Sequence, residues 1–365
     1  MRWDNLRIDS TSGTDAAAGS GSAAPADGTL PLIERSAVVR TFDTPGFRGM
    51  TFYEVQAKSI VSKVPAASMM PFTYTINPYR GCQHACSYCF ARNTHTYLDL
   101  DAGQDFNSKV IVKVNAPELL RAKLSSRGWA GKHIAMGTNV DCYQRAEGRY
   151  GLMRPIIGAL RDARNPFSIL TKGTLILRDV DLLLESAAVT EVGLNVSAGF
   201  VDKDLWRAIE PGTPAPGRRL DACAALNDAG LPCGVLMGPV VPYLSDSPAQ
   251  LEAAVRAAAA AGATHVTPIV LHLRPGAREW FLGWLGQAHP ALVPRYAELY
   301  GRGAYARKDY QARIGGQVRE LAQRHGIGRS RGPRGERTVG GAAAGNGADG
   351  GHADGARARE QLALF

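Results

Sequence analysis

The stretch Asn77–Cys89, NPYRGCQHACSYC, places Cys82, Cys86 and Cys89 on one short segment, with Tyr88 directly before the last of them. Their spacing is C-x₃-C-x₂-C. Six cysteines in 365 residues are too few for a disulfide scaffold, so this clustering indicates metal or redox chemistry. Three thiolates on one tight loop can hold three corners of a cubic [4Fe–4S] cluster. The missing fourth protein ligand would leave one iron open for catalysis.

A zinc knuckle is the alternative interpretation of this loop, with His84 or a distant cysteine as the fourth ligand. Zinc knuckles usually combine two C-x₂-C pairs, whereas Cys142, Cys223 and Cys233 are isolated in the sequence. The motif therefore favours an iron–sulfur cluster over zinc. We expect Cys223 and Cys233 to be packing residues.

Around the loop, short apolar runs alternate with helical patterns. The expected strands are Tyr74–Asn77, Val110–Val114, His133–Gly137, Ser168–Thr171, Glu191–Ser197, Gly234–Val240 and Val266–Leu271. The expected helices are Ala116–Ser125, Arg149–Arg161, Asp179–Ala187, Pro216–Ala229 and Pro248–Ala261. This alternation predicts an α/β fold with a parallel sheet, and about six β/α units fit a complete or partial barrel. Polar residues follow the expected strands, at the working face of a barrel: Asn77, Thr138, Asn139, Asp141, Thr171, Lys172, Asn195 and Ser197.

Composition divides the chain into three parts. Residues 1–45 are expected to be a flexible, largely disordered extension, because Ser10–Gly28 consists mainly of small and polar residues. Residues 46–325 are the expected catalytic domain, and residues 326–365 a flexible basic tail. Residues 301–365 hold 12 basic and 6 acidic side chains of a chain with a net charge of +9. This basic end is compatible with a polyanionic partner such as nucleic acid.

The hydropathy pattern predicts neither membrane insertion nor secretion. The most apolar stretch, around Val235–Leu244, is interrupted by Gly238, Pro239 and Pro242. The N-terminal residues show no apolar core of a signal peptide. We therefore expect a cytoplasmic protein.

With its cysteine loop and several later motifs, the sequence resembles a known family, the radical S-adenosylmethionine (SAM) superfamily. Within it, the chain is similar to the spore photoproduct lyase-like, or DNA repair photolyase-like, proteins. The resemblance covers about residues 70–300. It rests on Asn77–His95, MGTNVDCYQ (Met136–Gln144), LTKGTLILRD (Leu170–Asp179), EPGTPAPGRRL (Glu210–Leu220) and GPVVPYLSD (Gly238–Asp246).

The resemblance implies a partial (β/α)6-type barrel, a [4Fe–4S] cluster and bound SAM, whose reductive cleavage gives a 5′-deoxyadenosyl radical that abstracts hydrogen from substrate. It also implies an electron donor such as flavodoxin or ferredoxin. Lys172 matches the position that pairs with the SAM carboxylate, and a solvated loop lysine is the alternative. The candidate cofactor-binding residues are Tyr88, Thr138, Asn139, Lys172, Asn195 and Ser197. Asp141 and Arg218 are weaker candidates.

The resemblance to spore photoproduct lyase-type proteins implies a hydrogen-donating cysteine after a central strand, but the matching position here is Gly137, followed by Thr138 and Asn139. Cys142, five residues further on, is the candidate catalytic hydrogen donor. The alternative is that Cys142 is a small buried hydrophobic residue. No catalytic role is assigned to the histidines His84, His95, His265 and His272.

The leading functional hypothesis is a radical SAM enzyme that acts on a nucleic-acid base, such as a DNA lesion. RNA, a protein or a metabolite are the alternative substrates. A third hypothesis is a non-catalytic iron–sulfur adaptor in a repair complex. The open iron and the polar strand ends favour an enzyme.

The last five residues are Gln361, Leu362, Ala363, Leu364 and Phe365, which follow a long run of Gly, Ala and Arg. They resemble the pentapeptide QLxLF by which bacterial polymerases and repair proteins bind the DNA sliding clamp. Such a sequence should occur by chance on the order of once in 10⁵ positions. We predict a sliding-clamp partner bound through Gln361, Leu362, Leu364 and Phe365. Docking on the chain's own domain is the alternative.

Overall fold

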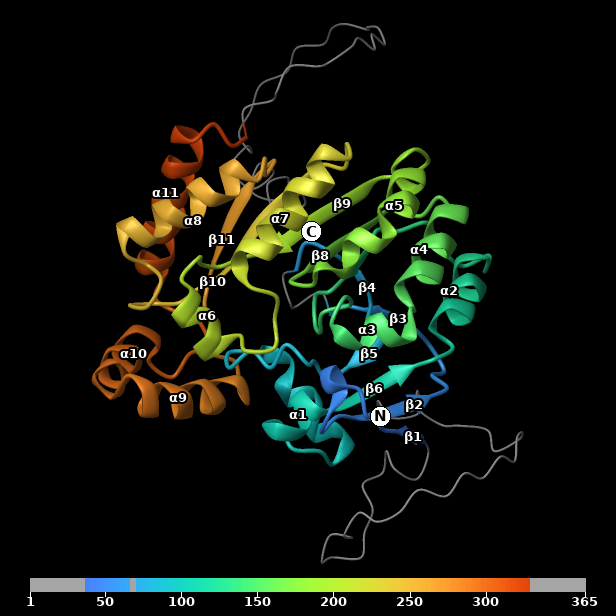
Figure 1. Cartoon of the computed structure of the whole chain (residues 1–365), viewed down its shortest axis with the longest axis horizontal. Coiled ribbons are helices and arrows are strands. Elements are labelled where there is room, and N and C mark those ends of the chain that lie inside the picture. The colour runs from blue at the N-terminus through green and yellow to red at the C-terminus, as the bar shows by residue number, and fades with distance from the viewer. Residues whose placement is uncertain (1–36, 66–69, 329–365) are drawn as a thin grey trace, which may run out of the picture.

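The computed structural model describes residues 37–65 and 70–328, whose strands form two sheets (Figure 1). The larger sheet contains β3 (Val61–Lys63), β4 (Tyr74–Ile76), β7 (Ile134–Met136), β8 (Phe167–Thr171), β9 (Val192–Ser197), β10 (Cys233–Val240) and β11 (Val266–Val270). Its strand order is β11-β10-β9-β8-β7-β4-β3. The six strands from β11 to β4 are parallel to one another, and β3 is antiparallel to β4. The predicted α/β fold with a partial barrel is confirmed.

Most of the helices lie on the outside of the larger sheet, where they connect its parallel strands. They are α2 (Ala116–Leu124), α3 (Arg145–Tyr150), α4 (Met153–Asp162), α5 (Val180–Ala187), α6 (Lys203–Ile209), α7 (Pro216–Asp228) and α8 (Pro248–Ala260). Helix α8 begins with a capping box formed by Ser247 and Gln250, with Pro248 in its first turn. All residues of β10 are buried, as expected of a parallel strand with side chains packed on both faces.

The smaller sheet contains β1 (Val38–Arg40), β2 (Thr51–Val55), β5 (Tyr79–Arg80) and β6 (Lys109–Lys113), in the order β1-β2-β6-β5. One prediction is wrong in detail, because the expected strand Val110–Val114 corresponds to β6 and does not join the barrel. It pairs parallel to β2 and antiparallel to β5. An apolar run shows that a strand exists but not which neighbour it pairs with. Strand β1 lies within residues 1–45, the range assigned to the N-terminal extension.

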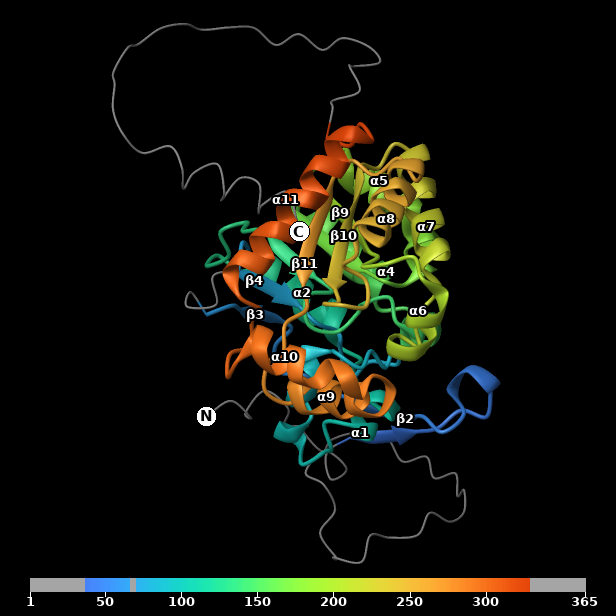
Figure 2. The same cartoon turned by 90° about the vertical axis from the view of Figure 1, so that its left-hand side faces the viewer.

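The remaining elements lie mainly around the carboxyl ends of the barrel strands and at the β11 edge. They are the 3₁₀ helices η2 (Pro45–Phe47), η4 (Phe90–Thr94), η5 (Thr96–Leu98), η6 (Thr174–Asp179) and η7 (Pro290–Leu292), and the helices α1 (Gln104–Ser108), α9 (Ala277–Ala288), α10 (Val293–Tyr300) and α11 (Lys308–Arg324). Figure 2 shows β10 and β11 pointing toward α9 and α10. Helix α11 packs against α8 and against β11, the edge strand of the barrel.

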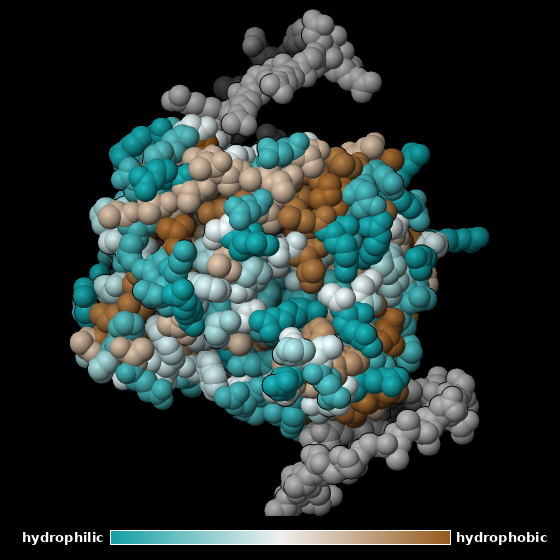
Figure 3. Space-filling model, viewed as in Figure 1, coloured by the Kyte–Doolittle hydropathy of each residue, from teal (hydrophilic) through white to brown (hydrophobic). Residues whose placement is uncertain are grey.

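The surface view in Figure 3 shows hydrophilic and hydrophobic residues interspersed over one face of the molecule. In the described part of the chain, no helix combines the length and the hydropathy that crossing a membrane would require.

Candidate active site

The cysteine loop follows β5 and is held by backbone contacts on several sides. The Cys82 N–H donates to the Phe106 carbonyl at 3.0 Å, and the Ser87 N–H donates to the Ile209 carbonyl at 2.9 Å. The Gln144 side chain clamps the turn, because its Oε1 accepts from the Gln83 N–H and its Nε2 donates to the Gly81 carbonyl, each at 3.0 Å. The conformation of this loop is therefore set by the barrel and the smaller sheet together.

The three thiols of the loop differ little in environment. Cys82 and Cys86 are buried, and Cys89 is half-buried. Burial raises the pKa of all three thiols, that of Cys86 to about 12. Thiolates at these positions need a positively charged partner such as iron. Among the described residues, no three His, Cys, Asp or Glu side chains are grouped closely enough to hold a single metal ion.

Buried polar atoms near the thiols also fit a bound group. Both polar atoms of the Gln83 side chain and the Ser87 hydroxyl lack a hydrogen-bond partner among the described residues, as does Asn77 Oδ1. Such atoms are rare in native interiors and call for an explanation such as a bound ion or water. The three thiols and these unpartnered polar atoms near them therefore fit a bound iron–sulfur cluster with a chelating cofactor.

A charged cluster faces the loop from the strand ends. Lys172, directly after β8, donates from Nζ to Ser197 Oγ at 2.7 Å, and its Nζ lies 3.9 Å from Glu210 Oε1. The same ammonium lies 5.9 Å from the centroid of the Tyr88 ring. Ser197 ends β9 and donates its hydroxyl to the Gly238 carbonyl at 3.0 Å. The structure thus brings Tyr88, Lys172 and Ser197 together, although they are far apart in sequence.

Glu210 is the centre of this charged cluster. It accepts hydrogen bonds from the Tyr88 hydroxyl and from the Arg219 guanidinium. Burial alone would raise the pKa of Glu210, but Arg219 and Lys172 bring it below its usual value, so the buried side chain is a carboxylate. Arg219 also donates to the Ser197 carbonyl at 3.2 Å. Sequence reasoning missed both residues and named the neighbouring Arg218, which is exposed on α7.

Asp141 links three parts of the site. Its carboxylate accepts from Thr171 Oγ1 at 2.7 Å and from the Lys172 N–H at 2.6 Å. His84 Nδ1 of the cysteine loop lies 3.4 Å from Asp141 Oδ2. Burial lowers the pKa of His84 to about 4, so its imidazole is neutral at pH 7. Asp141 therefore fixes the end of β8, and with it Lys172, relative to the cluster loop.

The remaining candidates fall at different depths. Asn195 Oδ1 accepts a hydrogen bond from His265 Nε2 at 2.8 Å, just before β11, and so Asn195 lies deeper in the barrel than Ser197. Thr138 is half-buried two residues after the end of β7, and Asn139 lines a cavity described below. Cys142 is buried, and burial raises the pKa of its thiol well above the usual value.

Gly137, at the position where the resemblance leads one to expect a donor cysteine, adopts a backbone conformation that favours glycine. Its φ is +76°, and a Cβ atom there would lie 1.8 Å from the Leu170 carbonyl oxygen of the neighbouring strand. No side chain fits this backbone without displacement of β8.

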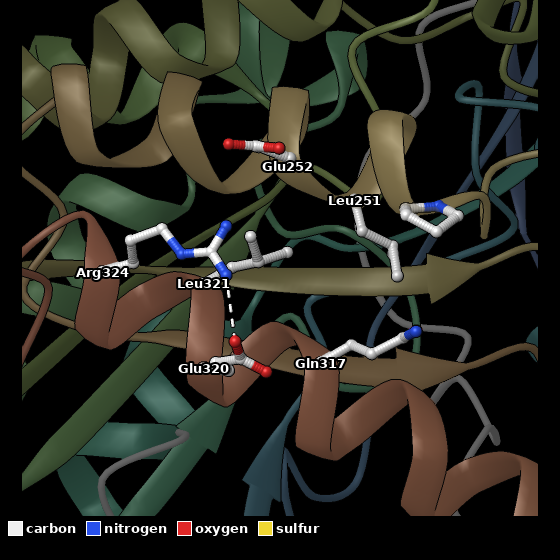
Figure 4. A pocket seen from close by; sticks show the side chains of 7 residues that line it. Leu251, Glu252, Gln317, Glu320, Leu321 and Arg324 are labelled. Atoms are coloured by element: carbon white, nitrogen blue, oxygen red, sulfur yellow. Dashed lines mark hydrogen bonds and ion pairs between the residues drawn. The ribbon is translucent and has the colours of Figure 1, made fainter.

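A cavity of about 310 Å³ opens beside the cysteine loop. Its lining consists of Phe90, Asn93, Thr94, Tyr97, Asn139, Arg274 and Pro275. Phe90 directly follows Cys89, and Asn139 follows the end of β7, so the cavity borders the candidate cofactor site. A second cavity of about 180 Å³ lies between α8 and α11 and contains none of these residues (Figure 4). That groove is lined by Leu251, Glu252, Glu320, Leu321 and Arg324 among others, and Arg324 is already bonded to Glu320.

Comparison with protein families identifies the chain. The model of the radical SAM superfamily matches residues 76–266, which include the cysteine loop and the strand ends from β4 to β10. The chain belongs to the radical SAM superfamily. It is accordingly a radical SAM enzyme, and its family implies a [4Fe–4S] cluster and SAM as cofactors.

Proteins of similar sequence occur in Mycobacterium tuberculosis and Methanocaldococcus jannaschii. An uncharacterized protein of Mycobacterium tuberculosis is 49% identical over 299 residues, which is 82% of this chain and 88% of that protein. An uncharacterized protein of Methanocaldococcus jannaschii is 34% identical over 53% of this chain and 69% of its own length. Among solved structures, spore photoproduct lyase complexed with dinucleoside spore photoproduct gives a TM-score of 0.58 at 14% identity, covering 76% of this chain and 80% of that one. A mutant of that lyase with bound SAM and the same dinucleoside gives 0.55 at 16% identity, covering 70% and 75%. This likeness shows a shared fold.

Proposed function

We propose that this radical SAM enzyme abstracts a hydrogen atom from a nucleic-acid base, such as a base in a DNA lesion. The observation that carries the choice of substrate is the cavity beside Cys89, whose rim combines aromatic rings with an arginine. The solved spore photoproduct lyase, which shares the fold, binds a dinucleoside photoproduct.

The rim of the cavity suits a planar ring. Phe90, Tyr97 and Tyr305 are 42%, 56% and 48% exposed, and they are the exposed aromatic residues of the described part of the chain. Phe90 and Tyr97 line the cavity together with Arg274, and Tyr305 is a hydrogen-bond partner of Arg274 outside the lining. Its guanidinium carbon lies 5.6 Å from the centroid of the Phe90 ring, and its NH2 donates to the Tyr305 hydroxyl at 3.1 Å. Unpaired bases stack on aromatic rings and on arginine guanidinium planes.

Two amides complete the chemistry that a base requires. Asn93 and Asn139 line the same cavity, and an asparagine amide offers both a donor and an acceptor to a base edge. Exposed rings that flank an arginine would contribute less to the binding of a protein segment or an aliphatic metabolite than to the stacking of a base. These features favour a nucleic-acid base over the alternative substrates.

The residues at the strand ends would hold the cofactors. Cys82, Cys86 and Cys89 would ligate the cluster. When bound, the cluster supplies the electron that cleaves SAM and so generates the radical that takes hydrogen from the substrate. Lys172 would pair with the SAM carboxylate, and Glu210 keeps its ammonium and the Tyr88 ring in position. Ser197 and Thr138 would border the cofactor, with Asn139 and Asn195 as further candidates.

The partners proposed for this function are a nucleic acid, a one-electron donor such as flavodoxin or ferredoxin, and the bacterial sliding clamp. The clamp-binding residues Gln361, Leu362, Leu364 and Phe365 lie outside the described residues. We also propose that the catalytic domain spans residues 46–325 and that the protein is cytoplasmic.

The test is to measure 5′-deoxyadenosine formed by anaerobically reconstituted, reduced enzyme with SAM, in the presence and absence of ultraviolet-damaged DNA. We expect damaged DNA to raise the yield and Cys86→Ala to abolish it. Arg274→Gln should weaken DNA binding by about 10-fold, because one stacking contact is worth about 1–3 kcal/mol.

The matched control is Arg295→Gln, since Arg295 also lies over an aromatic ring, with its guanidinium carbon 3.9 Å from the centroid of the Tyr243 ring. Equal binding by the two arginine variants, or a yield indifferent to DNA, would overturn the nucleic-acid substrate. Stimulation by RNA alone would replace DNA with RNA. Complete absence of 5′-deoxyadenosine would favour the non-catalytic adaptor.

A further inference from the structure

Arg92 is a fully buried arginine that lies three residues after the last cysteine. Its side chain is 0% exposed. Its Nε and one terminal nitrogen donate to the Cys86 carbonyl at 3.2 and 2.9 Å. The same guanidinium donates to the carbonyls of Ala102 and Gly103 and to Asn107 Oδ1, at 3.1, 2.9 and 3.0 Å. Arg92 thus ties the cysteine loop to the segment that leads into α1 and β6.

Aromatic rings enclose the same guanidinium. Its central carbon lies 5.2 Å from the centroid of the Phe106 ring and 4.6 Å from that of Trp280 on α9. The cation is therefore packed among carbonyl oxygens and aromatic rings, away from water.

The partners of Arg92 are neutral, which is unusual for a buried arginine. Within the described residues no carboxylate forms an ion pair with it, whereas the other fully buried arginine of the site, Arg219, is paired with Glu210. A buried charge without a counter-charge costs several kcal/mol, at the order of magnitude found for desolvated ions. Burial lowers the pKa of the Arg92 guanidinium, and the ionisable groups that act on it most strongly are the thiols of Cys89, Cys86 and Cys82, followed by the exposed Asp101 carboxylate, which forms no ion pair with it.

We propose that Arg92 is the internal counter-ion of the iron–sulfur cluster and raises its reduction potential. Each ligating thiolate brings one negative charge, and reduction by the one-electron donor adds another. A fixed buried cation stabilises the more negative, reduced state, and net charge is one of the factors that set cluster potentials. Arg92 is a positioning residue, because it would affect the reaction only through the charge state of the cluster and through its hydrogen bonds to the Cys86 carbonyl. The inference does not depend on the substrate.

The test is a spectroscopically monitored redox titration of the reconstituted protein, without SAM or nucleic acid, with dithionite as the reductant. Arg92→Gln removes the charge and should shift the midpoint potential to more negative values. Arg92→Lys keeps the charge but loses most hydrogen bonds, so it should restore part of the shift.

A second variant keeps the arginine in place. Asn107→Asp puts a carboxylate of nearly the same shape against the guanidinium, 3.0 Å away in the present contact. Neutralising the cation in this way should lower the potential in the same direction as Arg92→Gln. If Arg92→Gln does not bind iron, the midpoint potential of Asn107→Asp tests the proposal instead.

The proposal is overturned if Asn107→Asp carries a full cluster with the wild-type potential. It is also overturned if Arg92→Lys and Arg92→Gln shift the potential equally, because a structural role would affect both alike. Since no SAM or substrate is present, the result is independent of whether DNA is the substrate.

Discussion

Cys142 is buried to 1% exposure close to two acidic side chains. Burial raises the pKa of its thiol well above the usual value, and the charges of Asp141 and Glu147 raise it further. The sulfur therefore keeps its hydrogen at neutral and mildly alkaline pH, as a hydrogen-atom donor must.

If Cys142 quenches a product radical, Cys142→Ala should still form 5′-deoxyadenosine but lose or divert the final product. In the wild type, the product distribution should not change between pH 7 and 9, because the thiol titrates only above this range. Chromatography of the products, with buried Cys223→Ala as the control, measures both effects. An unchanged product distribution in Cys142→Ala would return this residue to the packing interpretation.

The sequence alone predicts part of the charged cluster around Glu210. Lys172 and Ser197 were expected near the cofactor and do contact each other. The sequence did not single out Glu210 and Arg219 as site residues, although both lie in the block Glu210–Leu220 that supports the family resemblance. The sequence pattern does not show which of two adjacent arginines points inward, because that depends on the rotation of α7 against the sheet.

At the scale of elements, the cysteine loop depends on a turn that only glycine adopts readily. Gly81 has a φ of +83°, and a Cβ atom there would lie 2.6 Å from the Lys109 carbonyl oxygen. The loop therefore sits directly against β6 of the smaller sheet. Any side chain at this position would push the loop away from β6 and so displace the thiols.

Gly81→Ala should lower the free energy of unfolding by about 1–3 kcal/mol, the cost of a strained backbone, and reduce the iron bound after reconstitution. Gly128→Ala is the control, because nothing lies within 4 Å of a Cβ atom at Gly128. Thermal melting and iron analysis measure the two effects. Equal iron content in both variants would show that the loop tolerates displacement.

The barrel strands and most of the helices that connect them were predictable, because apolar runs and helical periodicity are local signals. The helix expected at Arg149–Arg161 is divided at Gly151, whose φ of +62° ends α3 before α4 begins. Membership of β6 in the smaller sheet and the positions of α9, α10 and α11 depend on long-range packing. Local patterns carry no information about such packing.

On the scale of the whole molecule, the basic C-terminal portion and the final pentapeptide suggest a tethered enzyme. These last residues lie outside the part of the chain that the structure describes. A tether to the sliding clamp would raise the local concentration of the enzyme at DNA without new contacts by the catalytic domain.

A peptide of the last twelve residues should bind purified sliding clamp saturably, and a version with Leu364→Ala and Phe365→Ala should not. The two apolar side chains are expected to fill a pocket on the clamp, with Gln361 supplying hydrogen bonds. Isothermal titration measures both peptides. Equal binding, or none by the native peptide, would contradict the partnership and favour docking on the chain's own domain.

The geometry at Gly137 has a consequence for the history and the engineering of this enzyme. With the Leu170 carbonyl 1.8 Å from where a Cβ atom would stand, a single Gly→Cys exchange cannot install a thiol here. Gly137→Cys requires the Gly137 backbone or β8 to move, whereas the reverse change from cysteine to glycine meets no such barrier. Directed evolution toward a thiol at this position should therefore combine the substitution with changes that widen the space between β7 and β8.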